Sequence, residues 1–80
     1  MAHARKFTKG RTYAERGGMW TGMRWRIVDR WQTGSATFVR METALRSTYA
    51  QRVASNMTAR VTIKDGIENC TGGFYGRVFA

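Results

Sequence analysis

The most informative stretch of the chain lies at positions 23–31 and reads Met23-Arg24-Trp25-Arg26-Ile27-Val28-Asp29-Arg30-Trp31. Its odd positions carry Met, Trp, Ile, Asp and Trp, whereas its even positions carry Arg, Arg, Val and Arg. Because side chains alternate between the two faces of a strand, this period of two predicts one mostly apolar face and one mostly cationic face. Residues 19–31 therefore contain the clearest strand signal. Residues 32–35 read as a hairpin loop, and Ala36 to Met41 read as a returning second strand.

The following segment predicts a helix from Glu42 or Thr43 to Met57. Apolar side chains recur every four residues, at Met41, Leu45, Tyr49, Val53 and Met57. This spacing places them along one side of a helix, so we expect that side to pack against the sheet. Thr43 is a suitable N-cap, and Asn56 is a suitable end.

The last third of the chain predicts further strands. Residues 60–64 alternate again, and we expect Val61 and Ile63 to point inward. Asp65-Gly66 is a turn signal, residues 67–73 look like a loop, and Phe74 to Phe79 form a last short strand.

Two glycine-rich segments share a simple pattern. Residues 17–22 and residues 72–76 each join a double glycine to aromatic residues and a further glycine. The shared pattern is too short to indicate a duplication. An additional strand near Arg11 to Glu15 would precede the first of these segments.

Together these elements predict an α+β fold, with a small antiparallel sheet in ββαββ order and one amphipathic helix packed on one face. We expect residues 1–12 to form a basic flexible arm and residues 13–80 a single domain. The strand-strand-helix order from Arg11 to Ser55 is similar in outline to the arm-binding domains of phage-type integrases, in which a small sheet reads DNA. That likeness covers element order alone.

Charge is the strongest compositional feature. The 80 residues include 14 Lys and Arg against 5 Asp and Glu, for a formal net charge of +9, and eleven of the 14 cations are Arg. A field of this size attracts polyanions, and arginine grips phosphate and stacks on bases. A GC-rich genome would also raise the arginine content, but it would not explain the shortage of acids.

The predicted sheet has one face that the helix leaves open, and the alternation places cations on it. With Trp25 and Ile27 inward, the neighbouring arginines of that strand point outward. We expect the binding residues of the open face to be Arg24, Arg26, Arg30, Arg60, Lys64, Tyr75 and Arg77. Trp20 is expected as an exposed stacking platform. The basic arm would add Arg5, Lys6, Lys9 and Arg11.

Catalytic and metal chemistry find little support in the sequence. His3 is the only histidine and Cys70 the only cysteine, and the five carboxylates are scattered. These residues give no nucleophile–base pair and no four-ligand zinc set. We therefore expect no enzyme activity, no cofactor and no metal.

Two function hypotheses remain open. The first is a regulatory or accessory nucleic-acid-binding module, with DNA weakly favoured over RNA, that inserts a cationic ribbon into a major groove or stacks single strands. The second is a small inhibitor or adaptor, of the kind that phages and mobile elements encode, that docks its basic surface on an acidic protein. A core this small would also gain from a homodimer. No signal peptide or membrane span is evident, so we expect a cytoplasmic protein that does not act at a membrane.

Overall fold

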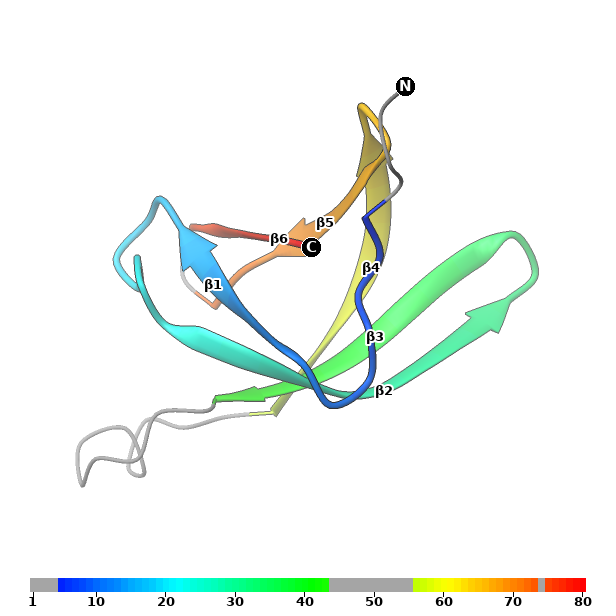
Figure 1. Cartoon of the computed structure of the whole chain (residues 1–80), viewed down its shortest axis with the longest axis horizontal. Coiled ribbons are helices and arrows are strands. Elements are labelled where there is room, and N and C mark those ends of the chain that lie inside the picture. The colour runs from blue at the N-terminus through cyan, green and yellow to red at the C-terminus, as the bar shows by residue number, and fades with distance from the viewer. Residues whose placement is uncertain (1–4, 44–55, 74) are drawn as a thin grey trace.

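The computed structural model describes residues 5–43, 56–73 and 75–80, and these residues form a closed antiparallel β-barrel (Figure 1). Each strand pairs with the next along the chain, and the last strand pairs with the first. The strands are β1 (Thr12–Arg16), β2 (Arg24–Thr33), β3 (Ala36–Thr43), β4 (Asn56–Lys64), β5 (Ile67–Thr71) and β6 (Arg77–Phe79). Because the barrel closes, each strand has a paired neighbour on both sides. This arrangement suits a domain too small to cover an open sheet.

The predicted α+β fold is wrong, because the described part of the chain is all-β. Thr43, the expected N-cap, is the last residue of β3, and Asn56, the expected helix end, is the first residue of β4. Residues 44–55 of the predicted helix lie outside the described residues. The apolar stripe suggested a helix, but its first and last residues, Met41 and Met57, are instead cross-strand partners in β3 and β4. The likeness in element order to integrase arm-binding domains fails with the helix.

The inward side of the strands builds one core. Trp25 and Ile27 are buried as the alternation predicts, and the hairpin to β3 forms across Gly34-Ser35. The remaining buried apolar side chains come from all around the barrel and are Phe7, Val39, Met41, Ala59, Val61, Cys70 and Val78. Burial of this apolar set supplies the main driving force for folding.

A β-bulge in β2 shifts the alternation by one residue. The pairing between β2 and β3 changes register between Ile27 and Asp29. Asp29 lies on the apolar side of the sequence pattern, but it pairs with exposed Arg40 on the outer surface. Arg30 now pairs with fully buried Val39 and so faces the interior.

The β4–β5 hairpin contains two confirmed and two incorrect predictions, and buried Val61 is one of the confirmed ones. Asp65 and Gly66 form its turn with φ of 54° and 76°, as expected for a two-residue hairpin loop. Residues 67–71 form β5 rather than a loop. Ile63, expected inward, is 69% exposed, because it lies near the hairpin turn, beyond the last β4 residue paired with β3, and has β5 alone beside it.

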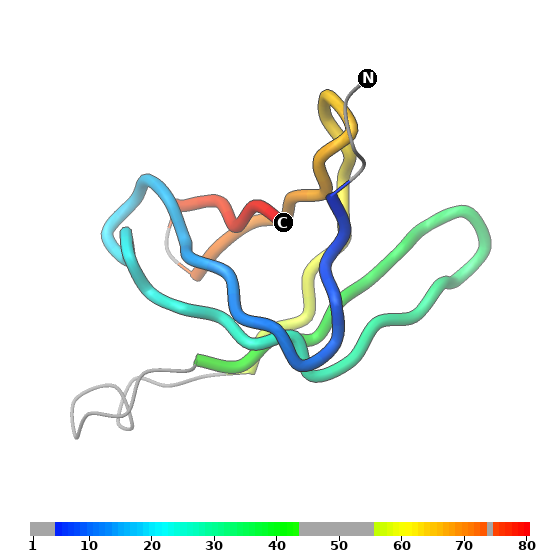
Figure 2. Tube along the Cα trace, in the orientation of Figure 1, coloured from blue at the N-terminus to red at the C-terminus, as the bar shows by residue number. Residues whose placement is uncertain are grey.

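The N-terminal segment packs onto the barrel from residue 5 onward (Figure 2). The Arg5 N–H donates to the Gly66 carbonyl, and the Glu68 N–H donates to the Arg5 carbonyl, both at 3.0 Å. Phe7 is 2% exposed, and its ring meets Tyr13 edge to face at 5.1 Å between centroids. Residues 5–11 of the expected arm are therefore held against the barrel.

Candidate nucleic-acid interface

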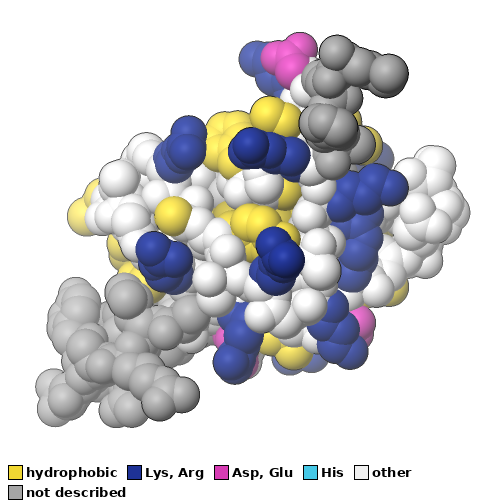
Figure 3. Space-filling view, viewed as in Figure 1, with side chains coloured by type: hydrophobic (Ala, Val, Ile, Leu, Met, Phe, Trp, Pro, Cys, Tyr) yellow, Lys and Arg dark blue, Asp and Glu magenta, His cyan; other side chains and the backbone are white. Residues whose placement is uncertain are grey.

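The barrel places its cations outside and part of its acids inside. Of the twelve Lys and Arg residues that the structure describes, eleven are exposed and Arg30 alone is half-buried. Glu15 and Glu68 are buried, at 1% and 3% exposure, so three of the five acids remain to offset the surface cations. In Figure 3, Lys and Arg side chains spread over the visible face with hydrophobic side chains between them, and acidic side chains appear at its margins. The surface is therefore more cationic than composition alone indicates.

Three arginines lie together on the outer side of β6, β1 and β2. Arg16 of β1 is the direct cross-strand partner of Arg77 in β6, and Ala14 of β1 is the partner of Arg24 in β2. We call Arg16, Arg24 and Arg77 the arginine face. Within the described chain, the two ion pairs are Arg26–Glu42 and Arg30–Glu68, so none of the three arginines of this face forms an ion pair with a described carboxylate. Like charges directly opposite each other in a sheet repel, and an anion between them would relieve that cost.

A groove adjoins the arginine face. Its volume is about 400 Å³, and its lining residues are Arg5, Ala14, Arg16, Ile67, Phe79 and Ala80. We call this set the basic groove. The Arg16 guanidinium carbon lies 5.8 Å from the centroid of the Phe79 ring, a cation–π contact, and Phe79 is 38% exposed. The groove thus combines two cations with an accessible aromatic surface.

The predicted binding residues do not all share one surface. Arg24 and Arg77 lie on neighbouring parts of the arginine face, whereas Arg60 lies on β4, two strands away from both β2 and β6. Arg26 is outward but paired with Glu42, and Lys64 lies beside the turn of the β4–β5 hairpin. Lys6, Lys9 and Arg11 are exposed on the N-terminal segment. Because the sheet closes into a barrel, the predicted binding residues lie on different sides of the molecule rather than on one open face.

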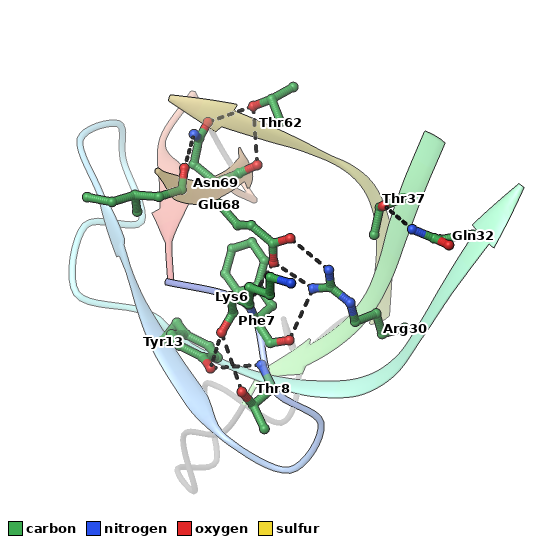
Figure 4. Close-up of polar contacts among 11 residues, drawn as sticks. Lys6, Phe7, Thr8, Tyr13, Arg30, Gln32, Thr37, Thr62, Glu68 and Asn69 are labelled. Atoms are coloured by element: carbon green, nitrogen blue, oxygen red, sulfur yellow. Dashed lines mark hydrogen bonds and ion pairs between the residues drawn. The ribbon is translucent and has the colours of Figure 1, made fainter. Parts of the chain in front are cut away.

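Arg30 belongs to the interior (Figure 4). Its Nη1 donates to Glu68 Oε1 at 2.6 Å and its Nη2 donates to Glu68 Oε2 at 2.7 Å, while Nη1 also donates to the Phe7 carbonyl at 3.2 Å. Glu68 accepts a further bond from the Phe7 N–H at 2.8 Å. The hydrogen bond to Arg30 lowers the pKa of Glu68, and the same contact raises the pKa of Arg30. This cluster fastens the N-terminal segment to β2 and β5.

Trp25 lies in the core as expected, whereas Trp20 and Trp31 take different places from those expected. Trp20 is half-buried and stacks on buried Trp25 with 6.2 Å between ring centroids, so it is only partly accessible. Trp31, expected in the core, is 37% exposed and stacks on Phe38 at 5.9 Å. The bulge moved Trp31 outward, and the sequence pattern alone carried no signal for it.

The two glycine-rich segments pack against each other around Glu15. The Glu15 carboxylate accepts from Trp25 Nε1 at 3.0 Å and from the Gly73 N–H at 2.6 Å. A Cβ at Gly72 would overlap Glu15, and one at Gly73 would overlap Trp20, so both close approaches require glycine. Tyr75 follows with φ of 58° and 87% exposure. Sequence reasoning missed Glu15, because a lone carboxylate in a strand gives no sign of its partners.

Cofactor chemistry finds no obvious site in the described segments. Nowhere in them do three His, Cys, Asp or Glu residues lie close enough to hold a metal ion. Burial raises the pKa of the Cys70 thiol to about 12, so this side chain is an inert part of the core. Among the described residues no helix has the length and apolarity needed to cross a membrane.

Comparisons with protein-family models, with curated proteins and with solved structures found no significant match to this chain.

Proposed function

We propose that this protein binds nucleic acid through the arginine face and the basic groove, as a non-catalytic module. The observation that carries the proposal is the direct pairing of Arg16 with Arg77 across β1 and β6, with neither in an ion pair among the described residues. A fold gains nothing from this repulsion, whereas a phosphate placed between the two guanidinium groups would accept hydrogen bonds from both.

The size of the binding surface sets the expected salt dependence. Arg5, Arg16, Arg24 and Arg77 surround the groove and the face, which allows about four phosphate contacts. For a duplex, log affinity should then fall against log salt with a slope of about −3.6, and for a single strand with a slope of about −2.8. A slope near zero would contradict a phosphate-driven interface.

The test compares two double variants that lose the same charge. Arg16→Gln/Arg77→Gln removes the paired arginines, and Arg40→Gln/Arg60→Gln removes two exposed arginines from the outer side of β3 and β4. Binding is measured by fluorescence anisotropy of a labelled oligonucleotide between about 50 and 200 mM salt. We expect the first variant to reduce the slope by about 1.4–1.8 and the second to leave it nearly unchanged. Equal losses in both variants would mean diffuse charge attraction and would remove the site from the proposal.

A second control tests for an acidic protein partner. An acidic polypeptide such as polyglutamate carries charge without phosphate geometry or bases. If polyglutamate displaced the oligonucleotide at equal charge concentration, the surface would be a general polyanion receptor, and an acidic protein would become the better candidate partner.

A further inference from the structure

Exposed aromatic and cationic side chains alternate along β6 and the residues just before it. Tyr75 lies before the strand, Arg77 begins it and Phe79 ends it. Arg77 and Phe79 lie on the same outer side, because Val78 between them is fully buried. Arg16 stands opposite Arg77 and contacts the Phe79 ring, so it links the arginine face to the basic groove.

The basic groove offers apolar surface as well as phosphate donors. Ala14, Ile67 and Phe79 contribute apolar side chains to its lining, alongside Arg5 and Arg16. A phosphate needs only donors, whereas a nucleobase needs an apolar or aromatic surface beneath its face. The faces of bases in a duplex are covered by their stacked neighbours, so only an unpaired base could lie on Phe79.

Tyr75 is held in an unusual backbone conformation that exposes its ring. A non-glycine residue at φ of 58° lies in the sterically disfavoured left-handed region, and such strain persists where the surrounding structure fixes it. Two contacts hold the backbone around Tyr75 in place. The Gly73 N–H donates a hydrogen bond to Glu15, and Gly72 and Gly76 pack closely on the same carboxylate. A buried anchor therefore keeps an 87% exposed aromatic ring at one end of the arginine face.

We infer that the ligand is a single strand, lying along β6 with one base on Phe79, another on Tyr75 and the intervening phosphates on Arg16 and Arg77. This inference rests on the proposed nucleic-acid binding and specifies its substrate class. The sequence of aromatic, cation and aromatic along β6 matches the combination of stacking platforms and a cationic track that single-strand binders use.

The experiment measures two probes, a labelled oligothymidylate of about 12 nucleotides and a blunt duplex of the same length. The variants Phe79→Leu and Tyr75→Leu each remove a ring without changing charge. Trp31→Leu is the matched control, because Trp31 has nearly the same exposure as Phe79, 37% against 38%, but lies on the outer side of the β2–β3 hairpin. Thermal unfolding of each variant checks that the barrel is intact.

We expect the single strand to bind more tightly than the duplex. Phe79→Leu and Tyr75→Leu should each weaken single-strand binding by about 5-fold to 100-fold while leaving duplex binding and the salt slope unchanged, and Trp31→Leu should change neither probe. If Phe79→Leu unfolds, Tyr75→Leu still decides the matter, because the Tyr75 side chain is 87% exposed.

Two other results have distinct meanings. Salt-dependent binding in which duplex equals single strand, or in which the leucine variants bind as the parent does, would overturn the single-strand inference and leave the proposed function intact. Absence of salt-dependent binding to both probes would overturn the proposed function itself, and the inference with it.

Discussion

Replacing Glu68 by Gln should destabilise the barrel far more than the same replacement at Glu42. Both carboxylates pair with an arginine of β2, but the two sites differ in burial: the Arg30 and Glu68 side chains are 28% and 4% exposed, against 52% and 32% for Arg26 and Glu42. The two variants therefore change the same chemical group in two solvent environments.

The expected magnitude follows from the contacts at Glu68. A Gln carbonyl oxygen at the Oε1 position keeps the bonds from the Phe7 N–H and from Arg30 Nη1, but the bond from Arg30 Nη2 and the negative charge are lost, and the new amide NH₂ faces the Arg30 donor. Breaking a buried ion pair costs roughly 3–5 kcal/mol, and partial rehydration of Arg30 reduces this to about 2–3 kcal/mol. An exposed pair such as Arg26–Glu42 contributes about 0–1 kcal/mol.

Thermal and urea unfolding, followed by tryptophan fluorescence, measure the difference. For a domain of this size, Glu68→Gln should lower Tm by about 10–20 °C, whereas Glu42→Gln should lower it by a few degrees at most. The parent should also lose stability as pH falls below the ordinary Glu pKa of about 4.3, because its Glu68 pKa is lowered in the folded state, and Glu68→Gln should flatten that loss. Equal effects of the two substitutions would refute the clamp between the N-terminal segment, β2 and β5.

Three further predictions follow from the interior and from Tyr75. Gly76→Ala should destabilise by about 1–3 kcal/mol in urea unfolding, because its Cβ would overlap Glu15, whereas Gly34→Ala, with open space around it, should show only the cost of a positive φ, about 1 kcal/mol. The Cys70 thiol should resist alkylation at about pH 8 in the folded protein and react at once in urea, and rapid labelling of the native state would contradict its burial. Tyr75→Asn should raise stability by about 0.5–1 kcal/mol by relieving the left-handed backbone while weakening single-strand binding; a loss of stability would mean that the backbone at this position is not strained.

The strands with regular alternation were predictable from sequence. Trp25 and Ile27, the apolar residues of positions 24–27, are the buried apolar residues of β2, and the Gly34-Ser35 and Asp65-Gly66 turns lie where local residue preferences place them. Local chemistry decides these features, so one segment suffices to predict them.

The unpredicted features depend on partners distant in sequence. Strand β5 carries Glu68, Asn69 and Cys70 in buried positions, a pattern that reads as a loop until Arg30, Phe7 and Thr62 supply hydrogen bonds. The β2 bulge, which turns Arg30 inward, also could not be predicted, because no residue in the strand signals it.

The sequence predicted that the candidate site consists of exposed arginines, but not which arginines lie next to each other. Arg24, Arg26, Arg60 and Arg77 are all exposed as the alternation indicates, yet only barrel closure brings Arg77 beside Arg16. Arg16 was not among the predicted binding residues, because nothing in the sequence shows that β1 and β6 are neighbours.

The pairing of the first strand with the last also determines how a nascent chain must fold. Chains emerge from the ribosome N-terminus first, and until β6 is available β1 lacks one neighbour and Glu15 lacks the Gly73 N–H that it binds in the finished barrel. An incomplete chain therefore has open strand edges and an incompletely bonded carboxylate, both of which disfavour a stable partial barrel. Stable folding of this domain should consequently begin only after residue 79 has left the ribosome, as a late and cooperative event.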